Sequence, residues 1–445
     1  MKYSKLKILF FCLLGVIVCN NANAQTAEVI TLQQAVEKTL ANNLQIRQAQ
    51  YQAAITDENL KQSKFELYPS VSSSFSARRQ FGFYSDPQSL RLINSTIDQL
   101  QGGLNTSILL FGGGTLMNQI KQNKSFLMSD KSNIEKIKND LSLSVVNTYL
   151  QILNNQDLVK ASQQQFELSS QQLNVAQRNF DVGNNTQADL SQSKAQVANN
   201  ELSITNAQNA FELSLLNLKQ LMEMNPEQNI SVQVPVIDDP ENIKNDYTGF
   251  DVYTKAVGNY PDIKVAEYNS EAFKYGIKIA KGNLYPSLSF GGGLSTGYSS
   301  SVAVPFYDQF SNRNFGQFLG FNLNIPIFNN YRNRSSYNIA KIRYENAKAS
   351  EQLAKNNLNK IISQAVLDLK SAIKSYDATK SAFESSKEAF NVIKQRYEVG
   401  LVNVIELNTS QTNYNKAEFD FIQAKYNVIF RQKVIDFYLG NPLTL

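Results

Sequence analysis

The strongest constraint on the fold is an internal duplication with a nearly constant offset. The segment Leu67–Ser72 returns as Leu284–Ser289, and Phe180–Gly183 returns as Tyr397–Gly400, in both cases 217 residues later. Almost no insertion separates the two copies. A repeat of this kind indicates that each half of the chain folds into the same structural unit.

The duplication divides the chain into two repeats around a linker. We assign residues 25–226 to the first repeat and residues 250–445 to the second. The intervening stretch 227–249 is interrupted by Pro235 and Pro240 and is predicted to be the linker. Each repeat is expected to contain a helix, two strands, a long helix, a tip turn and a final helix.

The N-terminus has the features of a secretory signal peptide. Three lysines precede an apolar run over residues 8–19, and an Ala-x-Ala site follows that ends at Ala24. Cleavage there predicts residues 1–24 as the signal and removes Cys12 and Cys19. Lipidation of Cys19 is an alternative, but Val18 is bulky where a small residue is expected. No other stretch is apolar enough for a membrane helix, so the exported chain could enter a membrane only as a β-barrel.

Composition argues against an enzyme. The 445-residue chain has no His, and its two Cys lie in the predicted signal, so His- and Cys-based catalysis and metal ligation are excluded. The glycine runs 112–114 and 291–293 lack the Gly-Lys-Ser/Thr of a phosphate-binding loop. A net charge of only +5 disfavours a nucleic-acid partner. We expect no catalytic residue, no cofactor and no metal site.

Each repeat contains two segments in which apolar and small polar residues alternate. We predict strands over about 69–84 and 100–111 in the first repeat, and over about 286–299 and 315–328 in the second. One apolar face and one face of Ser, Gly and Asn is typical of a transmembrane barrel strand. The alternative is a soluble β-sandwich with one face exposed to solvent. Arg79 is a charge on the apolar face, and we expect it to snorkel toward the membrane interface.

Most of the remaining chain is predicted to be long helix with a seven-residue apolar period. We expect helices over about 115–182, 187–224, 333–399 and 403–439. Apolar residues recur every seven positions at Val145, Ile152, Val159, Phe166, Leu173 and Phe180, and at Ile362, Leu369, Tyr376, Phe383, Phe390 and Tyr397. After each glycine turn the stripe resumes, at Leu190, Val197, Ile204, Phe211 and Leu218, and at Leu407, Tyr414, Phe421, Val428 and Ile435. A strict heptad stripe predicts coiled-coil packing. Thr31 and Gln34 form a capping-box pattern that opens the first helix.

Four strands cannot close a membrane barrel, so the pattern requires several chains. Two chains would supply eight strands and an interior filled by side chains, whereas three would supply twelve strands and a water-filled bore. The small polar face favours the trimer. The predicted fold is an internally duplicated α+β membrane protein with long coiled-coil helices and a trimeric twelve-stranded β-barrel. The family resemblance described next implies that this β-barrel continues into a long coiled-coil α-helical barrel.

The chain resembles the TolC-like outer membrane efflux protein family. The resemblance is carried by Thr31–Val36 with Ala41–Ile46 in the opening helix, and by Asn259–Ile263 in its second-repeat counterpart. The Leu-Tyr-Pro-Ser strand entries and the Val-Gly turns, each followed by an acid, also match. The resemblance implies a homotrimer in the outer membrane of a Gram-negative bacterium that extends into the periplasm. Its implied partners are a periplasmic adaptor, an inner-membrane transporter and outer-membrane lipid.

The resemblance implies that function resides at the two periplasmic tips. The residues implied in adaptor docking are Val182, Gly183, Thr186, Asp189, Val399, Gly400, Asn403 and Glu406. For either glycine, a simple structural role in a tight turn is equally consistent with the pattern.

Three of the tip residues are candidates for a gate. Glu406 and Asp189 would place negative charge around a narrow mouth and favour cations there. Each acid could instead stabilise a helix N-terminus, and Tyr397 could equally be the last residue of the apolar stripe. Val402 and Asn185 leave no tip arginine, so a charged latch across the hairpins is not expected.

The implied function is a passive exit channel of a tripartite pump that exports drugs or other small molecules. Type I protein secretion and metal efflux are alternatives that the sequence does not separate, and a structural coiled-coil envelope protein is a more distant one.

Overall fold

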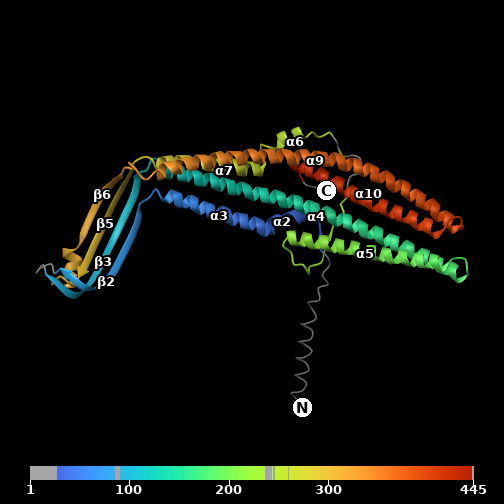
Figure 1. The fold of residues 1–445 in the computed structure, drawn as a ribbon, viewed down its shortest axis with the longest axis horizontal. Coiled ribbons are helices and arrows are strands. Elements are labelled where there is room, and N and C mark those ends of the chain that lie inside the picture. The colour runs from blue at the N-terminus through green and yellow to red at the C-terminus, as the bar shows by residue number, and fades with distance from the viewer. Residues whose placement is uncertain (1–27, 86–90, 236–242, 244–245, 259, 443–445) are drawn as a thin grey trace, which may run out of the picture. The chain divides into compact units, whose positions relative to one another are not determined.

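The structure is a computed structural model of the chain that describes residues 28–85, 91–235, 243, 246–258 and 260–442 (Figure 1). The predicted signal peptide, residues 1–24, lies outside the described residues, as do 236–242 and 244–245 of the predicted linker. Two compact units are present. One contains residues 1–47, 137–258 and 358–445, and the other contains residues 48–136 and 259–357. The units therefore cut across the two repeats, because each takes segments from both.

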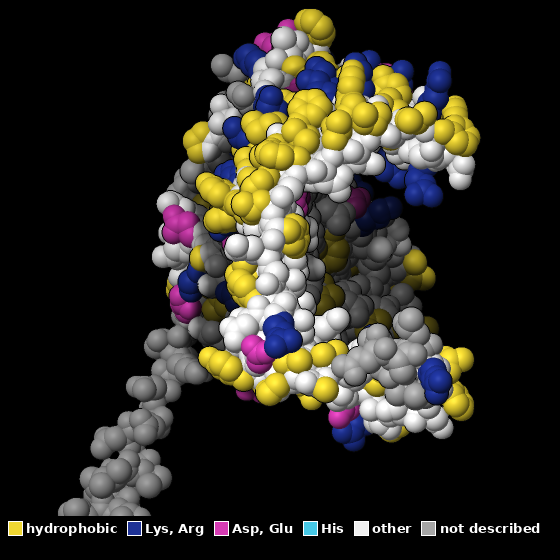
Figure 2. All heavy atoms as spheres, turned by 90° about the vertical axis from the view of Figure 1, so that its left-hand side faces the viewer, with side chains coloured by type: hydrophobic (Ala, Val, Ile, Leu, Met, Phe, Trp, Pro, Cys, Tyr) yellow, Lys and Arg dark blue, Asp and Glu magenta, His cyan; other side chains and the backbone are white. Residues whose placement is uncertain are grey.

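The second unit contains a four-stranded antiparallel sheet in the order β2-β3-β5-β6. Its strands are β2 (Ser70–Ser85), β3 (Leu92–Phe111), β5 (Ser287–Ser299) and β6 (Gly316–Asn324). Cross-strand pairs such as Phe290 with Phe321 and Leu288 with Leu323 collect apolar side chains on one face. Figure 2 shows hydrophobic side chains along the convex side of this curved sheet. β2 and β6 are its two edges.

Two strands differ in length from the prediction. β3 begins at Leu92, about eight residues before the alternation becomes regular, because it pairs with the full length of β2. β6 ends at Asn324 rather than near residue 328. Pro326 has no backbone N–H for a sheet hydrogen bond, which accounts for the early end.

Arg79 is paired across the sheet rather than isolated. Its guanidinium donates from Nε and Nη2 to the two carboxylate oxygens of Asp98, at 2.6 Å and 2.8 Å. The two residues are opposite one another in the β2–β3 register. The sequence analysis did not identify this bidentate partner on the neighbouring strand, and the snorkelling of Arg79 toward the membrane interface stays a prediction.

The distal end of β5 is capped by a side chain. The first residue of β6, Gly316, pairs with Ser295, so the residues of β5 beyond Ser295 have no partner on that side. Gln309, only 2% exposed, fills the gap. Its Oε1 accepts from the Ser299 N–H at 3.0 Å, and its Nε2 donates to the Ser299 carbonyl at 3.1 Å. The side-chain amide thus replaces a strand peptide, which protects an open edge. Gln309 follows α8 (Phe306–Asp308) and opens η3 (Gln309–Arg313).

The helices of this unit flank the sheet in sequence. α3 (Leu44–Phe65) precedes β2, and α7 (Pro261–Gly282) precedes β5. α4 (Thr115–Asp181) follows β3, and α9 (Arg332–Glu398) follows β6; both helices contribute to both compact units. At about 1.5 Å per residue, each of these 67-residue helices is about 100 Å long.

The other unit contains the remaining helices and a small parallel ribbon. Its elements are β1 (Glu28–Ile30), α2 (Leu32–Asn42), α5 (Gln187–Leu221), β4 (Ile230–Val232), α6 (Gly249–Ala256) and α10 (Val404–Leu439). β1 pairs with β4 in parallel. The predicted capping box of α2 is confirmed, with the Gln34 N–H donating to Thr31 Oγ1 at 3.1 Å and the Thr31 N–H donating to Gln34 Oε1 at 3.0 Å.

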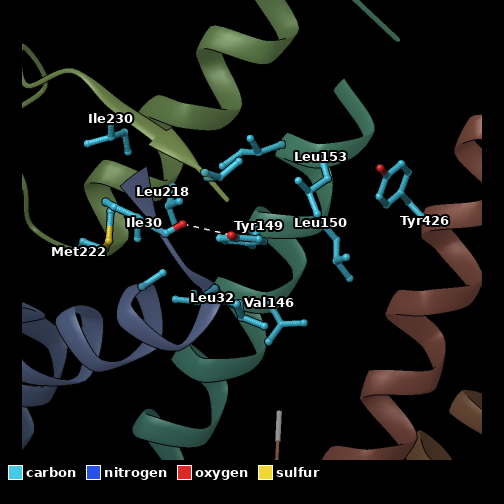
Figure 3. Close-up of a cluster of buried hydrophobic side chains, with 14 of the residues drawn as sticks. Ile30, Leu32, Val146, Tyr149, Leu150, Leu153, Leu218, Met222, Ile230 and Tyr426 are labelled. Carbon is cyan, nitrogen blue, oxygen red and sulfur yellow. Dashed lines mark hydrogen bonds between the residues drawn. The ribbon is translucent and has the colours of Figure 1, made fainter. Parts of the chain in front are cut away.

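The largest buried cluster of this unit lies around β1, β4 and α4 (Figure 3). Tyr149 is at its centre, and its hydroxyl donates to the carbonyls of Ile30 and Gln233 at 3.1 Å and 2.6 Å. Burial raises the pKa of Tyr149 to about 12. Val145 and Ile152, two residues of the predicted heptad stripe, are fully buried in the same cluster.

Candidate functional site

The first tip is a left-handed glycine turn. α4 ends at Asp181, and Gly183 has a φ of +81°. The Gly183 N–H donates to the Phe180 carbonyl at 2.9 Å, and the Asn184 N–H donates to the Asn179 carbonyl at 2.7 Å. These bonds satisfy the last carbonyls of the helix. Gly183 is needed at this position because other residues adopt a positive φ at a cost.

Asp189, the acid of the first tip, is part of a capping box. Thr186 is the N-cap of α5, and the Asp189 N–H donates to its Oγ1 at 3.2 Å. In return, Asp189 Oδ2 accepts from the Thr186 hydroxyl at 2.7 Å and from the Thr186 N–H at 2.9 Å. These hydrogen bonds, that of the hydroxyl first, hold the pKa of Asp189 below its usual range. The carboxylate therefore stabilises the start of α5.

The second tip repeats the backbone but leaves its acid free. Gly400 has a φ of +78°, and its N–H donates to the Tyr397 carbonyl at 3.0 Å. Asn403 is the N-cap of α10, and its Oδ1 accepts from the Glu406 N–H at 2.9 Å. The Glu406 carboxylate is exposed and forms no hydrogen bond or ion pair with any other described residue. Of the two candidate gate acids, Glu406 is the one whose carboxylate is not hydrogen-bonded to the cap of its own helix.

Both tips expose apolar side chains. Val182 and Val399, each next to its turn glycine, are both 71% exposed. Leu401 and Ile405 of the second tip are also exposed, and were not among the predicted site residues. Their signal in the sequence is an apolar side chain out of phase with the heptad stripe, in which Leu407 is buried. Figure 1 shows the two turns at the same end of their helices.

Tyr397 lies one heptad beyond a stack of aromatic rings. Along α9 and α10, Phe383 stacks on Phe421 with ring centroids 5.3 Å apart, and Phe390 stacks on Tyr414 at 5.5 Å. Tyr397 itself is half-buried. The stack confirms that the α9 and α10 stripes face one another. Whether Tyr397 also gates stays a prediction.

Polar contacts join the two hairpins within this unit. Gln165 of α4 is 4% exposed, and its Nε2 donates to Glu418 Oε2 of α10 at 3.0 Å. Further from the tips, the Tyr426 hydroxyl donates to Asp157 Oδ2 at 2.7 Å. Burial, with the Asp157 contact second, raises the pKa of Tyr426. These pairs tie α4 to α10 in one register.

A groove with a mixed polar and apolar lining runs between α4, α9 and α10 in the same unit. Its volume is about 490 Å³, and its lining includes Asn154, Ser375, Asp420 and Asn427. Asn154 is buried, and its Oδ1 has no hydrogen-bond partner within the described chain. In the described part of the chain, no three acidic, His or Cys side chains gather in a way that could hold a metal ion.

None of the described helices combines the length and apolar character needed to cross a membrane.

Comparisons with known proteins are consistent in sequence and in fold. Residues 35–222 and 252–441 match the family described as outer membrane efflux protein. The chain is 18% identical to the outer membrane efflux protein BepC of Brucella suis, over 91% of this chain and 84% of that protein. It is 24% identical to the toxin and drug export protein A of Aggregatibacter actinomycetemcomitans, over 91% and 85%.

A solved structure supports the same fold. The Campylobacter jejuni CmeC outer membrane channel superposes with a TM-score of 0.78 at 21% identity, over 93% of this chain and 87% of that one.

Proposed function

Because the chain belongs to the outer membrane efflux protein family, we propose that three copies form the exit channel of a tripartite pump and export small molecules. The family consists of efflux channels of the bacterial outer membrane that extend into the periplasm, and these channels are not enzymes. The trimer, its partners and its cargo are the parts that we propose.

The observation that carries the trimer is the open sheet. Each chain supplies four strands with unpaired edges at β2 and β6 and an apolar outer face. Unpaired backbone groups are costly in lipid, so the edges must pair with other chains. Three chains would give a twelve-stranded β-barrel wide enough for solutes. β2 of one chain would pair with β6 of the next.

The tips support docking to a periplasmic adaptor. Val182, Val399, Leu401 and Ile405 leave apolar surface at the end of two rigid hairpins. Exposed apolar surface of this kind is typical of protein–protein contacts. The docking set Val182, Gly183, Thr186, Asp189, Val399, Gly400, Asn403 and Glu406 would surround this surface. An inner-membrane transporter would supply the energy, since the channels of this family are not enzymes.

The same tips support a cation-favouring mouth. Three copies of the free Glu406 carboxylate around a narrow opening would attract cations. Asp189 would contribute less because its carboxylate is engaged by Thr186. Tyr397 would close the apolar contact beneath the mouth.

Single-channel conductance in planar bilayers tests the proposal. We expect small, cation-selective steps from the purified trimer. Glu406→Gln should reduce the cation selectivity, whereas the matched variant Asp189→Asn should leave it nearly unchanged. Steps insensitive to Glu406→Gln would keep the channel and remove Glu406 from the gate. A folded protein that is not a trimer and gives no conductance would overturn the proposal.

Protein secretion is the second candidate for the cargo. The relative named as a toxin and drug export protein favours it. Export assays with a fluorescent drug and with a secreted protein in a deletion strain would separate the two.

A further inference from the structure

The corner between β6 and α9 contains two locally unfavourable features within five residues: a tyrosine with a positive φ and arginines in the first turn of a helix. Asn330 and Tyr331 have φ values of +53° and +64°, in the left-handed region. Asn tolerates this region, but Tyr does so only with strain. Directly afterwards, Arg332 and Arg334 occupy the first turn of α9, which contains no acid. Cations there oppose the helix dipole.

The duplication shows that the strain is not required by the backbone. The positions equivalent to Asn330 and Tyr331 at the 217-residue offset are Gly113 and Gly114, with φ values of +61° and +75°. The first repeat thus makes the same turn with glycine, without cost. The second repeat keeps the turn but carries a tyrosine that is 58% exposed. Strain maintained in this way indicates a functional side chain.

The two arginine side chains have no structural partner, whereas the Tyr331 hydroxyl accepts from Asn338 Nδ2 at 3.3 Å. Both are exposed, and neither guanidinium makes an ion pair or hydrogen bond within the described chain. The local cap of α9 is neutral, since the Asn333 N–H donates to Asn329 Oδ1 at 3.5 Å. Residues 332–344 contain four cations and no acid. The positive charge of this turn is therefore uncompensated.

A lysine at the end of α7, the helix that leads into β5, lies beside this corner. Asn333 Nδ2 donates to the Asn283 carbonyl at 2.6 Å, which holds the start of α9 against the end of α7. Lys281 lies in that last turn of α7 and is exposed, as is Tyr285 just beyond it. A favourable helix dipole explains Lys281 but not Arg332 or Arg334. Cations and tyrosines thus gather beside the end of an exposed apolar sheet.

We propose that this corner, formed by Lys281, Tyr331, Arg332 and Arg334, binds the headgroups of anionic phospholipids in the periplasmic leaflet of the outer membrane. The inference rests on the proposed function, in which the sheet spans that membrane and the helices leave it at this corner. Exposed tyrosines suit the interface between hydrocarbon and headgroup, and adjacent cations suit phosphate. Charge complementarity thus selects a lipid bearing net negative charge over a neutral one.

The two arginines are not equivalent. Residues two apart on a helix point in directions about 200° apart, so one arginine faces lipid more directly than the other. Each basic residue at an anionic surface contributes a factor of about five in affinity. The double variant should therefore lose about fivefold or more, and the single variants should show which arginine contributes.

Native mass spectrometry of the purified trimer tests the proposal, with phosphatidylglycerol and phosphatidylcholine as probes. Wild type should retain phosphatidylglycerol in preference to phosphatidylcholine, and Arg332→Gln/Arg334→Gln should lose that preference. Lys370→Gln/Lys374→Gln removes the same charge from exposed positions further along α9 and should retain it. Tyr331→Gly, which installs the residue of the first repeat, should weaken binding without lowering the melting temperature.

Several outcomes would overturn the inference. An unchanged phosphatidylglycerol preference in the arginine double variant would do so, as would an equal loss in the Lys370/Lys374 control. Competition by inorganic phosphate as effective as competition by lipid would assign the corner to a free anion. Altered ion selectivity with unchanged lipid binding would place the arginines in the conduction path. Conductance of the wild-type trimer, measured in parallel, separates failure of this inference from failure of the channel.

Discussion

The hairpins α4–α5 and α9–α10 are copies of one unit that have diverged in their side chains. Their backbones agree, with Gly183 and Gly400 at nearly the same positive φ and an N-cap three residues beyond each. Their acids differ, because Asp189 caps its helix and Glu406 does not. The two copies keep the same turn, but the Glu406 carboxylate no longer takes part in the cap of its helix. The second hairpin is therefore the better candidate for a gate charge.

The same contrast extends into the helices. The α9–α10 hairpin is held by stacked rings, including Phe390 on Tyr414. The equivalent of Phe390 in the first repeat is Leu173, which is half-buried. The second hairpin therefore has a stiffer internal seam near its tip.

The largest expected effect tests this seam. Phe390 is 4% exposed, so Phe390→Ala should destabilise the α9–α10 hairpin by about 3–5 kcal/mol. Leu173→Ala should cost the first hairpin about 1–2 kcal/mol, because its side chain is only partly buried. Hydrogen exchange of amides near each tip measures both costs. Equal destabilisation of the two hairpins would contradict a stiffer seam in α9–α10.

The next effect should be equal in the two hairpins. A Cβ added at Gly183 or Gly400 would meet no atom within 4 Å, so only the left-handed backbone penalises a side chain. Gly183→Ala and Gly400→Ala should each cost about 1–2 kcal/mol of local stability. Gly258→Ala is the control, since its φ is not positive and it also has open space. Thermal unfolding and tip exchange would both reveal a difference between the two turns.

A smaller effect should distinguish the two acids. Asp189 and Glu406 are both the third residue of their helix, so their contributions to the helix dipole are comparable. Asp189→Ala also removes the acceptor of two Thr186 hydrogen bonds and should cost about 1 kcal/mol. Glu406→Ala should cost at most about 0.5 kcal/mol. A Glu406 variant as damaging as the Asp189 variant would show that this acid, too, is structural.

The smallest expected effect is a difference in pH dependence. The folded pKa of Asp189 is lowered, so its stabilisation is complete above the unfolded pKa of about 4 and is lost as the pH falls through the lower folded value. Exchange protection at the start of α5 should therefore decrease below about pH 4. Asp189→Asn should abolish that decrease, and a wild-type profile without it would contradict the capping role.

Periodic features of the sequence predicted the fold well. The duplication, the heptad stripes and the Thr31 cap depend on residues close together along the chain or at a fixed spacing. Ile152, Leu369 and Ile435 are buried as the stripe requires. The glycine turns were also predictable because a positive φ strongly favours glycine.

Features that depend on a distant partner were not predictable. Arg79 was interpreted alone because Asp98 belongs to a strand whose register no local pattern defines. Gln309 has no sequence signal, since its role depends on where β6 begins to pair with β5. At the tips, only the structure shows that the Asp189 carboxylate is hydrogen-bonded to Thr186 and that the Glu406 carboxylate is not bound by its N-cap.

The parallel ribbon of β1 and β4 affects the order in which the chain can fold as it emerges. Glu28 pairs with Ile230, so the first strand must wait for about 200 later residues before it has a partner. Contacts of such long range form slowly. A chain that crosses a membrane from its N-terminus would emerge with β1 unpaired and the Tyr149 cluster incomplete. We therefore expect its early residues to need protection from aggregation until β4, and later Tyr426 and Ile429 of α10, have arrived.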